Sequence, residues 1–112
     1  MNWNTLTSIA QLETIVNIQS HNAPILLFKH STRCSISTAS LSRVERNWKA
    51  DDNNKIQPYY LDLLEHRDIS NQIATLTGVE HASPQVLIIK NGTCVYNASH
   101  SEIRYDDIME NL

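Results

Sequence analysis

The sequence predicts an α/β fold, with a central mixed sheet of four strands flanked by helices. The spacing of apolar residues switches several times between a helical period and short β-rich runs, which is typical of chains that alternate helices and strands. One pair of β-rich runs flanks Asn91-Gly92, a dipeptide suited to a tight hairpin turn, so part of the sheet is antiparallel. A chain of 112 residues that is 41% hydrophobic encloses one core, and we expect a single domain over residues 1–112.

The first helix and the first strand are predicted before residue 30. Apolar residues at helical spacing form one stripe of a helix over about residues 5–20; they are Ile9, Leu12, Ile15 and Val16. Pro24 ends this segment because proline disfavours helix at the residue before it. Residues 25–28 are continuously apolar and too few for a helix, as expected for an interior strand covered on both faces.

A second helix and a second strand follow. Four apolar residues define the buried side of the helix, which ends at the polar residues 51–54; they are Ile36, Leu41, Val44 and Trp48. Residues 56–64 contain a β-favouring run with two tyrosines. Pro58 has no N–H to donate, so we expect the beginning of this strand at a sheet edge or outside the ladder.

The last third of the chain predicts a helix, a hairpin and a final helix. Ile69, Ile73 and Leu76 form the third helical stripe, and Gly78 suits the left-handed conformation at its end. The hairpin strands flank Asn91-Gly92, and a final helix carries one apolar side made by Tyr105, Ile108, Met109 and Leu112. This order of elements, parallel in its first half and antiparallel in its second, is that of the thioredoxin fold.

Charge and hydrophobicity exclude several classes of partner. The net charge of −3 comes from acids and bases mixed along the chain, without a basic block that would neutralise phosphates, so we expect no nucleic acid. No run approaches the ~20 apolar residues of a membrane helix, and the N-terminus does not resemble a signal peptide. We therefore expect a cytoplasmic protein without a membrane partner.

Cys34 is the candidate reactive residue, because it lies where the first predicted strand meets the second helix. The first turn of a helix presents unpaired N–H groups and the positive end of the helix dipole, which favour a thiolate. Arg33 adds a positive charge, and the hydroxyls of Ser35, Ser37 and Thr38 are available to donate to the sulfur or to cap the helix. The alternative is a packing cysteine, but the polar and hydroxyl-rich surroundings favour a thiol that reaches the surface.

Cys94 is interpreted differently, as a small packing residue in the middle of a hairpin strand. The two cysteines do not suggest a disulfide framework. A metal site could combine His30 and Cys34 with His81 or His100, but no recognised ligand spacing is present, and we expect no metal.

Three segments resemble one known family over essentially the whole chain. "FKHSTRCSIS", "GVEHASPQVLIIKNG" and "HSEI" are similar to the YtxJ-like bacilliredoxins, monothiol proteins of the bacillithiol system in the thioredoxin superfamily. The resemblance implies that Cys34 is the nucleophile and that Ser37 replaces the resolving cysteine of dithiol thioredoxins, giving a C-x-x-S site. It also implies a cis peptide bond before Pro84, which leaves the backbone of Ser83 open to a thiol substrate.

The function implied by this resemblance is thiol–disulfide exchange that removes bacillithiol from mixed disulfides on client proteins. Bacillithiol is then an exchanging co-substrate, and no tightly bound cofactor is expected. Ser31, Thr32 and Arg33 are candidate contacts for the carboxylates and sugar of bacillithiol. The sequence leaves the client proteins and the oligomeric state open. Ser35 departs from the family, in which this position is commonly proline.

Three other functions were weighed. A non-catalytic adaptor or thiol sensor would use the same cysteine once, without turnover. A monothiol glutaredoxin that binds an iron–sulfur cluster typically carries C-G-F-S, whereas this chain has Ile36 in the third place and no glycine. A phosphatase of the cysteine class is disfavoured because Ser40 stands where its arginine belongs.

Overall fold

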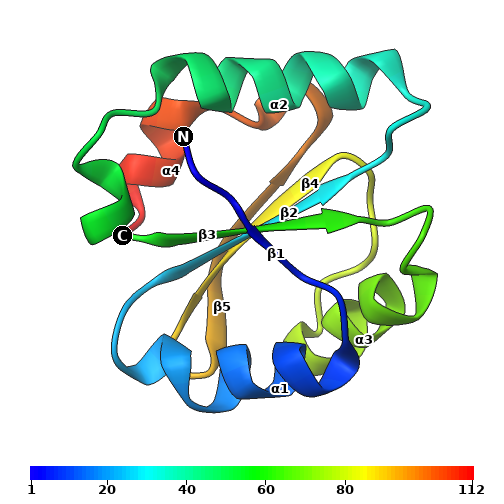
Figure 1. Cartoon of the computed structure of the whole chain (residues 1–112), viewed down its shortest axis with the longest axis vertical. Helices are drawn as coiled ribbons and strands as arrows, with labels where there is room; N and C mark the ends of the chain where they lie inside the picture. The colour runs from blue at the N-terminus through cyan, green and yellow to red at the C-terminus, as the bar shows by residue number, and fades with distance from the viewer.

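The computed structural model describes residues 1–112 and shows a sheet of five strands between two layers of helices (Figure 1). The strands are β1 (Asn4–Thr5), β2 (Ile25–His30), β3 (Gln57–Asp62), β4 (Gln85–Lys90) and β5 (Thr93–Ser99). The α-helices are α1 (Ile9–Asn17), α2 (Ser35–Asn47), α3 (Arg67–Thr77) and α4 (Tyr105–Glu110). Short 3₁₀ turns are η1 (Gln19–His21), η2 (Asp52–Asn54) and η3 (His100–Glu102).

The sheet order is β1-β3-β2-β4-β5, with parallel pairing among the first three strands and antiparallel pairing from β2 to β5. The mixed sheet confirms the predicted switch from parallel to antiparallel pairing. The predicted number of four strands is wrong, because β1 was not foreseen. It has only two residues, both exposed and polar, so it carries no apolar period and is held by its pairing with β3.

Helices cover both faces of the sheet, α1 and α3 on one face and α2 and α4 on the other (Figure 1). The strand β2 is buried along its whole length, as its apolar run predicted. Because side chains alternate across a strand, Leu27 packs with α1 and α3, whereas Leu26 and Phe28 pack with α2. The central strand therefore belongs to both hydrophobic cores.

Several boundaries differ from the prediction. The helix expected over residues 5–20 begins only at Ile9, because the Ser8 hydroxyl accepts the N–H of Gln11 at 3.1 Å and caps it. The helix α2 ends at Asn47, before the polar residues 51–54, and Trp48 has extended backbone. The strand expected over residues 56–64 is the shorter β3.

The predicted buried side of α2 is wrong at Ile36, whose side chain is 55% exposed. Val44 is buried and Leu41 and Trp48 pack against the same core, as predicted. Ser37 and Ser40, which the hydrophobic pattern did not assign to the core, are also fully buried. Ser40 is satisfied by donating to the carbonyl of His100 at 3.1 Å. Such hydrogen-bond partners, which periodicity does not reveal, allow polar residues to be buried on this face.

The special backbone positions agree with the sequence. Gly78 ends α3 with φ +71°, and Asn91 and Gly92 both have positive φ in the turn between β4 and β5, as a type I′ hairpin requires. Pro58 lies in β3 opposite Leu26, beyond the two residues where β1 pairs, so its missing N–H faces no strand. None of the helices has the length and hydrophobicity needed to cross a membrane.

Candidate functional site

Cys34 lies at the junction between β2 and α2, as the N-cap residue of that helix. Its backbone is fixed from both sides. Its N–H donates to the Ser31 carbonyl at 3.1 Å, and its carbonyl accepts the N–H of Thr38 at 3.0 Å and the Thr38 hydroxyl at 3.3 Å. The side chain is half-buried, so the thiol is placed by the helix and still reaches the surface.

Ser37 lies in the first turn of α2, three residues after Cys34, and is completely buried. Its hydroxyl oxygen is 2.7 Å from Nδ1 of His30 and accepts the N–H of Ser31 at 3.0 Å. Burial lowers the pKa of His30, against the opposing charges of Asp62 and Glu45, so the ring is neutral at neutral pH. The hydroxyls of Ser37 and Thr38 therefore bond to His30 and to the Cys34 carbonyl. Of the two roles that the sequence left open, neither hydroxyl donates to the sulfur, and that of Thr38 bonds to the backbone.

The loop before β4 approaches the same end of β2. Its Ser83–Pro84 peptide bond is cis, as the resemblance implied. Since Lys29 of β2 pairs with Gln85, the register places Pro84 beside the last residue of β2, at the end where Cys34 follows. Ser83 takes part in none of the backbone hydrogen bonds outside helices and strands, so its N–H and carbonyl are free to pair with another chain.

A cavity of about 300 Å³ opens beside the segment that precedes Cys34. Two loops line it, the one after β2 and the one after β3; the residues are Thr32, Arg33, Asp62, Leu64, Glu65 and Arg67. The only ion pair in the structure joins Lys55 and Asp52, so the two arginines and two carboxylates of this cavity are not paired with one another. The cavity brings Thr32 and Arg33 together with Arg67, which the sequence did not single out.

Lys29 is a second residue that sequence reasoning missed. It continues β2 on the face of α1 and α3 and has no exposed surface. Its ammonium group donates to the Ser70 carbonyl at 3.2 Å and lies 3.3 Å from Nδ1 of His81, which is also 3.2 Å from the Ser70 hydroxyl. Burial lowers its pKa to about 8. The available signal was a lysine in register with the buried Ile25 and Leu27.

The histidines considered for a metal site are separated by the sheet. His30 bonds to Ser37 on the α2 face, whereas His81 contacts Lys29 on the α3 face. The structure contains no group of three or more histidine, cysteine, aspartate or glutamate side chains placed to hold a metal ion.

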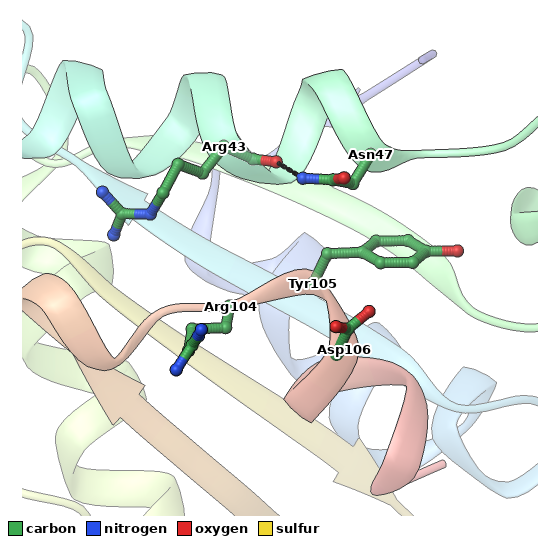
Figure 2. A pocket seen from close by; sticks show the side chains of 5 residues that line it. All are labelled: Arg43, Asn47, Arg104, Tyr105 and Asp106. Carbon is green, nitrogen blue, oxygen red and sulfur yellow. Dashed lines mark hydrogen bonds between the residues drawn. The ribbon is translucent and has the colours of Figure 1, made fainter.

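Another cavity, of about 170 Å³, lies between α2 and α4 and contains none of the predicted site residues. Figure 2 shows its lining, Arg43, Asn47, Arg104, Tyr105 and Asp106, with the amide of Asn47 bonded to the Arg43 carbonyl. The guanidinium of Arg43 donates to the carbonyls of His100 and Ile103 at 3.3 and 3.2 Å. These contacts fasten the C-terminal segment to α2, which is a structural role.

Cys94 packs against the core on the α1 side, which confirms the packing interpretation. Its thiol lies 3.3 Å from the Tyr96 carbonyl, and burial raises the pKa of the Cys94 thiol. Burial therefore favours the unreactive thiol at Cys94.

The comparison with protein families agrees with this geometry. A family described as "Monothiol bacilliredoxin BrxC" matches residues 4–108. The chain belongs to the monothiol bacilliredoxin BrxC family. Bacilliredoxins of this family act with a single thiol, which agrees with the serine at position 37 of this chain.

Solved structures show the thioredoxin fold. A protein described as a presumed oxidoreductase with a thioredoxin fold is 30% identical, with a TM-score of 0.80 over 96% of this chain and 90% of its own. Thioredoxin from Malassezia sympodialis is 16% identical, with a TM-score of 0.73 over 97% of this chain and 86% of its own. Thioredoxin from Fasciola hepatica is 18% identical, with a TM-score of 0.72 over 96% and 93%. The bacilliredoxin family and the 30% identical oxidoreductase support a redox function for the chain, and the two thioredoxins show its fold.

Proposed function

We propose that the chain is a thiol–disulfide oxidoreductase that removes bacillithiol from mixed disulfides on client proteins. The observation that carries the proposal is the half-buried Cys34 at the start of α2, with a buried serine, Ser37, where a resolving thiol would stand. A cytoplasmic location belongs to the same proposal, because small thiols keep that compartment reducing.

Cys34 lies at the end of α2 where backbone N–H groups are unpaired. The first N–H groups of a helix have no intrahelical partner, and the backbone N–H of Ser35 is unpaired in this structure. These groups and the positive end of the dipole of α2 stabilise a negative charge at the N-cap. The thiolate is the form that attacks a disulfide.

In the first step, the Cys34 thiolate attacks the bacillithiol sulfur of the mixed disulfide. A bond forms between Cys34 and bacillithiol, the disulfide bond to the client breaks, and the client sulfur leaves as a thiolate that takes a proton from water. The client is reduced, and Cys34 carries the bacillithiol.

In the second step, a free bacillithiol thiolate attacks the sulfur of the adduct. Cys34 leaves as a thiolate, and the two bacillithiol molecules form their own disulfide, which takes up the oxidising equivalent. Ser37 has no sulfur, so an internal disulfide with Cys34 at this site is impossible and a second thiol from solution is required.

The cavity beside Arg33 is the proposed site for the bacillithiol moiety. Arg33 and Arg67 are unpaired donors for its carboxylates, since guanidinium groups bind carboxylates in bidentate geometry. Thr32 and the carboxylates of Asp62 and Glu65 are available to its sugar hydroxyls. Ser31, the third contact suggested by the sequence, does not line this cavity and is left out of the proposed site.

The free backbone of Ser83 is the proposed site for the client. An extended client segment that pairs with Ser83 would bring its disulfide to the end of β2 where Cys34 lies. The exposed Ile36, two residues beyond Cys34, offers apolar contact to the same segment.

The experiment is a turnover assay on a client protein that carries bacillithiol on one cysteine. With excess bacillithiol, the wild type is expected to release many equivalents of reduced client per equivalent of protein. Cys34→Ala abolishes the release, and the matched control Cys94→Ala retains it. Release of a single equivalent that then stops, with bacillithiol still in excess, would refute catalysis and indicate a thiol sensor instead.

A further inference from the structure

The buried lysine on β2 has no partner that would explain it as an ion pair. Lys29 is fully buried, and no carboxylate lies within ion-pair distance of its ammonium group. Burying an ammonium group is costly unless its donors are satisfied. Its two acceptors are the Ser70 carbonyl at 3.2 Å and Nδ1 of His81 at 3.3 Å. The role of Lys29 is therefore to be found in the two residues to which its ammonium group donates, Ser70 and His81.

What Lys29 holds is the middle of the loop between α3 and β4, where His81 lies two residues before Ser83. The Ser70 hydroxyl, 3.2 Å from Nδ1 of His81, fastens the same ring to α3. Two further bonds fasten the loop: Gln85 donates to the Glu80 carbonyl at 3.0 Å, and the N–H of His100 donates to the Pro84 carbonyl at 3.1 Å. Lys29 thus ties the loop to the central strand, at the level where β2 leads to Cys34.

We propose that Lys29 and His81 are positioning residues for the exchange reaction, because their contact fixes the loop that carries the cis Ser83–Pro84 peptide beside Cys34. This inference rests on the proposed function, since it assigns the loop its role in holding a disulfide substrate. Neither residue touches the reacting sulfur in this proposal. They act indirectly, by fixing the position of the Ser83 backbone.

The contact depends on the protonation of His81. Lys29 can donate to Nδ1 only when that nitrogen carries no proton, and a protonated ring would place two cations 3.3 Å apart. The groups that face His81 are Lys29 from β2 and Arg67 and Ser70 from α3, and burial with these positive charges lowers the pKa of His81 from 6.5. The contact is therefore intact at neutral pH and is lost as the pH falls through the lowered pKa of His81.

The test compares two reactions of Cys34 over pH 5.5 to 8. Alkylation by iodoacetamide reports the thiolate alone, whereas exchange with a bacillithiol-modified client also needs the loop. The ratio of exchange to alkylation is expected to fall severalfold for the wild type as the pH decreases. His81→Gln, whose amide oxygen accepts from Lys29 without titrating, keeps the ratio constant, and His21→Gln, at the opposite end of the sheet, behaves as the wild type.

At pH 7.5, His81→Leu is expected to lower kcat/KM for the client about tenfold with unchanged alkylation, as a small displacement of a positioned group does. Equal exchange rates for His81→Leu and the wild type, or a wild-type ratio independent of pH, would overturn the inference. Amide hydrogen exchange of residues 79–84 is measured on the same variants. Faster loop exchange in His81→Leu, with no exchange reaction even in the wild type, would support the contact and refute the proposed function instead.

Discussion

Cys34 and Ser37 lie about one helical turn apart at the start of α2, and they differ in how far their side chains are buried. Cys34 is half-buried and its sulfur is free, whereas Ser37 is fully buried and its oxygen bonds to His30 and Ser31. In the proposed function, the position of a resolving thiol is thus used to hold the turn that precedes the nucleophile. The hydroxyl of Ser37 at this position ties the loop before Cys34 to His30, at the end of β2.

Ser37→Ala is expected to lower the free energy of unfolding by about 1–3 kcal/mol, because it leaves the buried Ser31 N–H and the His30 ring without a partner. Denaturation by urea measures the change. Ser42→Ala, on the same helix and without a side-chain hydrogen bond, is the matched control. Unchanged stability of Ser37→Ala would show that the hydroxyl network does not hold the turn.

The burial of Lys29 predicts how stability changes with pH. Its pKa is about 8 in the folded protein and 10.5 when exposed, so the unfolded chain binds more protons between these values and stability rises with pH. The slope is at most about 1.4 kcal/mol per pH unit for one proton. Lys29→Met should remove this rise.

The measurement is the urea midpoint of both proteins from pH 7.5 to 9.5. Burial raises the pKa of Cys94 and of Tyr59, which opposes the rise at the alkaline end, so the difference between Lys29→Met and the wild type is compared. Parallel pH curves for the two proteins would mean that Lys29 is not buried as an ammonium group.

At the residue scale the sequence predicted where Cys34 and Cys94 lie, the first at a strand–helix junction and the second packed in a hairpin strand, because their neighbours differ. It missed Lys29, because lysine is ordinarily exposed and the apolar run appeared to end at Phe28. Arg67 was missed for another reason. Its approach to Arg33 depends on how the loop after β3 folds back, and no spacing in the sequence reports that contact.

At the scale of elements, α2 shows what a hydrophobic pattern can and cannot predict. Its beginning after a polar junction was predicted, and Cys34 is indeed the N-cap residue. Its inward face was predicted in part, since Val44 is buried and Leu41 and Trp48 pack against the same core. Ile36, however, is exposed, and Ser37 and Ser40 are buried with hydrogen bonds. The strand β1 was invisible for a related reason, because pairing with β3 alone makes it a strand.

Ser35→Pro is expected to stabilise α2 by about 0.5–1 kcal/mol. Ser35 is the first helical residue, its N–H is unpaired, and Cys34 before it has φ −108° and ψ 119°, a conformation that proline tolerates in its neighbour. Thermal unfolding should show a higher Tm. A lower Tm would mean that the Ser35 N–H is needed where the structure leaves it unpaired.

At the scale of the whole molecule, the sheet gathers three loops at one end of β2. The loop after β2 brings Cys34, the loop after β3 brings Arg67, and the loop before β4 brings the cis Ser83–Pro84 peptide (Figure 1). These segments are far apart in the sequence. The resemblance to the bacilliredoxins implied that the first and third loops meet, whereas the cavity lined by both Arg33 and Arg67 came only from the structure.

Arg33→Ala and Arg67→Ala are each expected to raise about tenfold the bacillithiol concentration that gives half-maximal turnover, because each removes a charged donor to a carboxylate. The exposed Arg46, in the last turn of α2 and outside the cavity, is the matched control as Arg46→Ala. Raising the salt concentration should increase this half-maximal bacillithiol concentration more for the wild type than for the variant that carries both substitutions. Variants with unchanged bacillithiol dependence would remove the cavity from the site.

The central claim is that Cys34 is the single exchanging thiol, and its most direct measurement is the intact mass of the protein after exposure to bacillithiol disulfide. The account predicts one bacillithiol per chain, mapped by digestion to Cys34, released again by a thiol reductant, and absent from Cys34→Ala. An adduct carried by Cys94, or a wild type that stays unmodified under the same conditions, would contradict it.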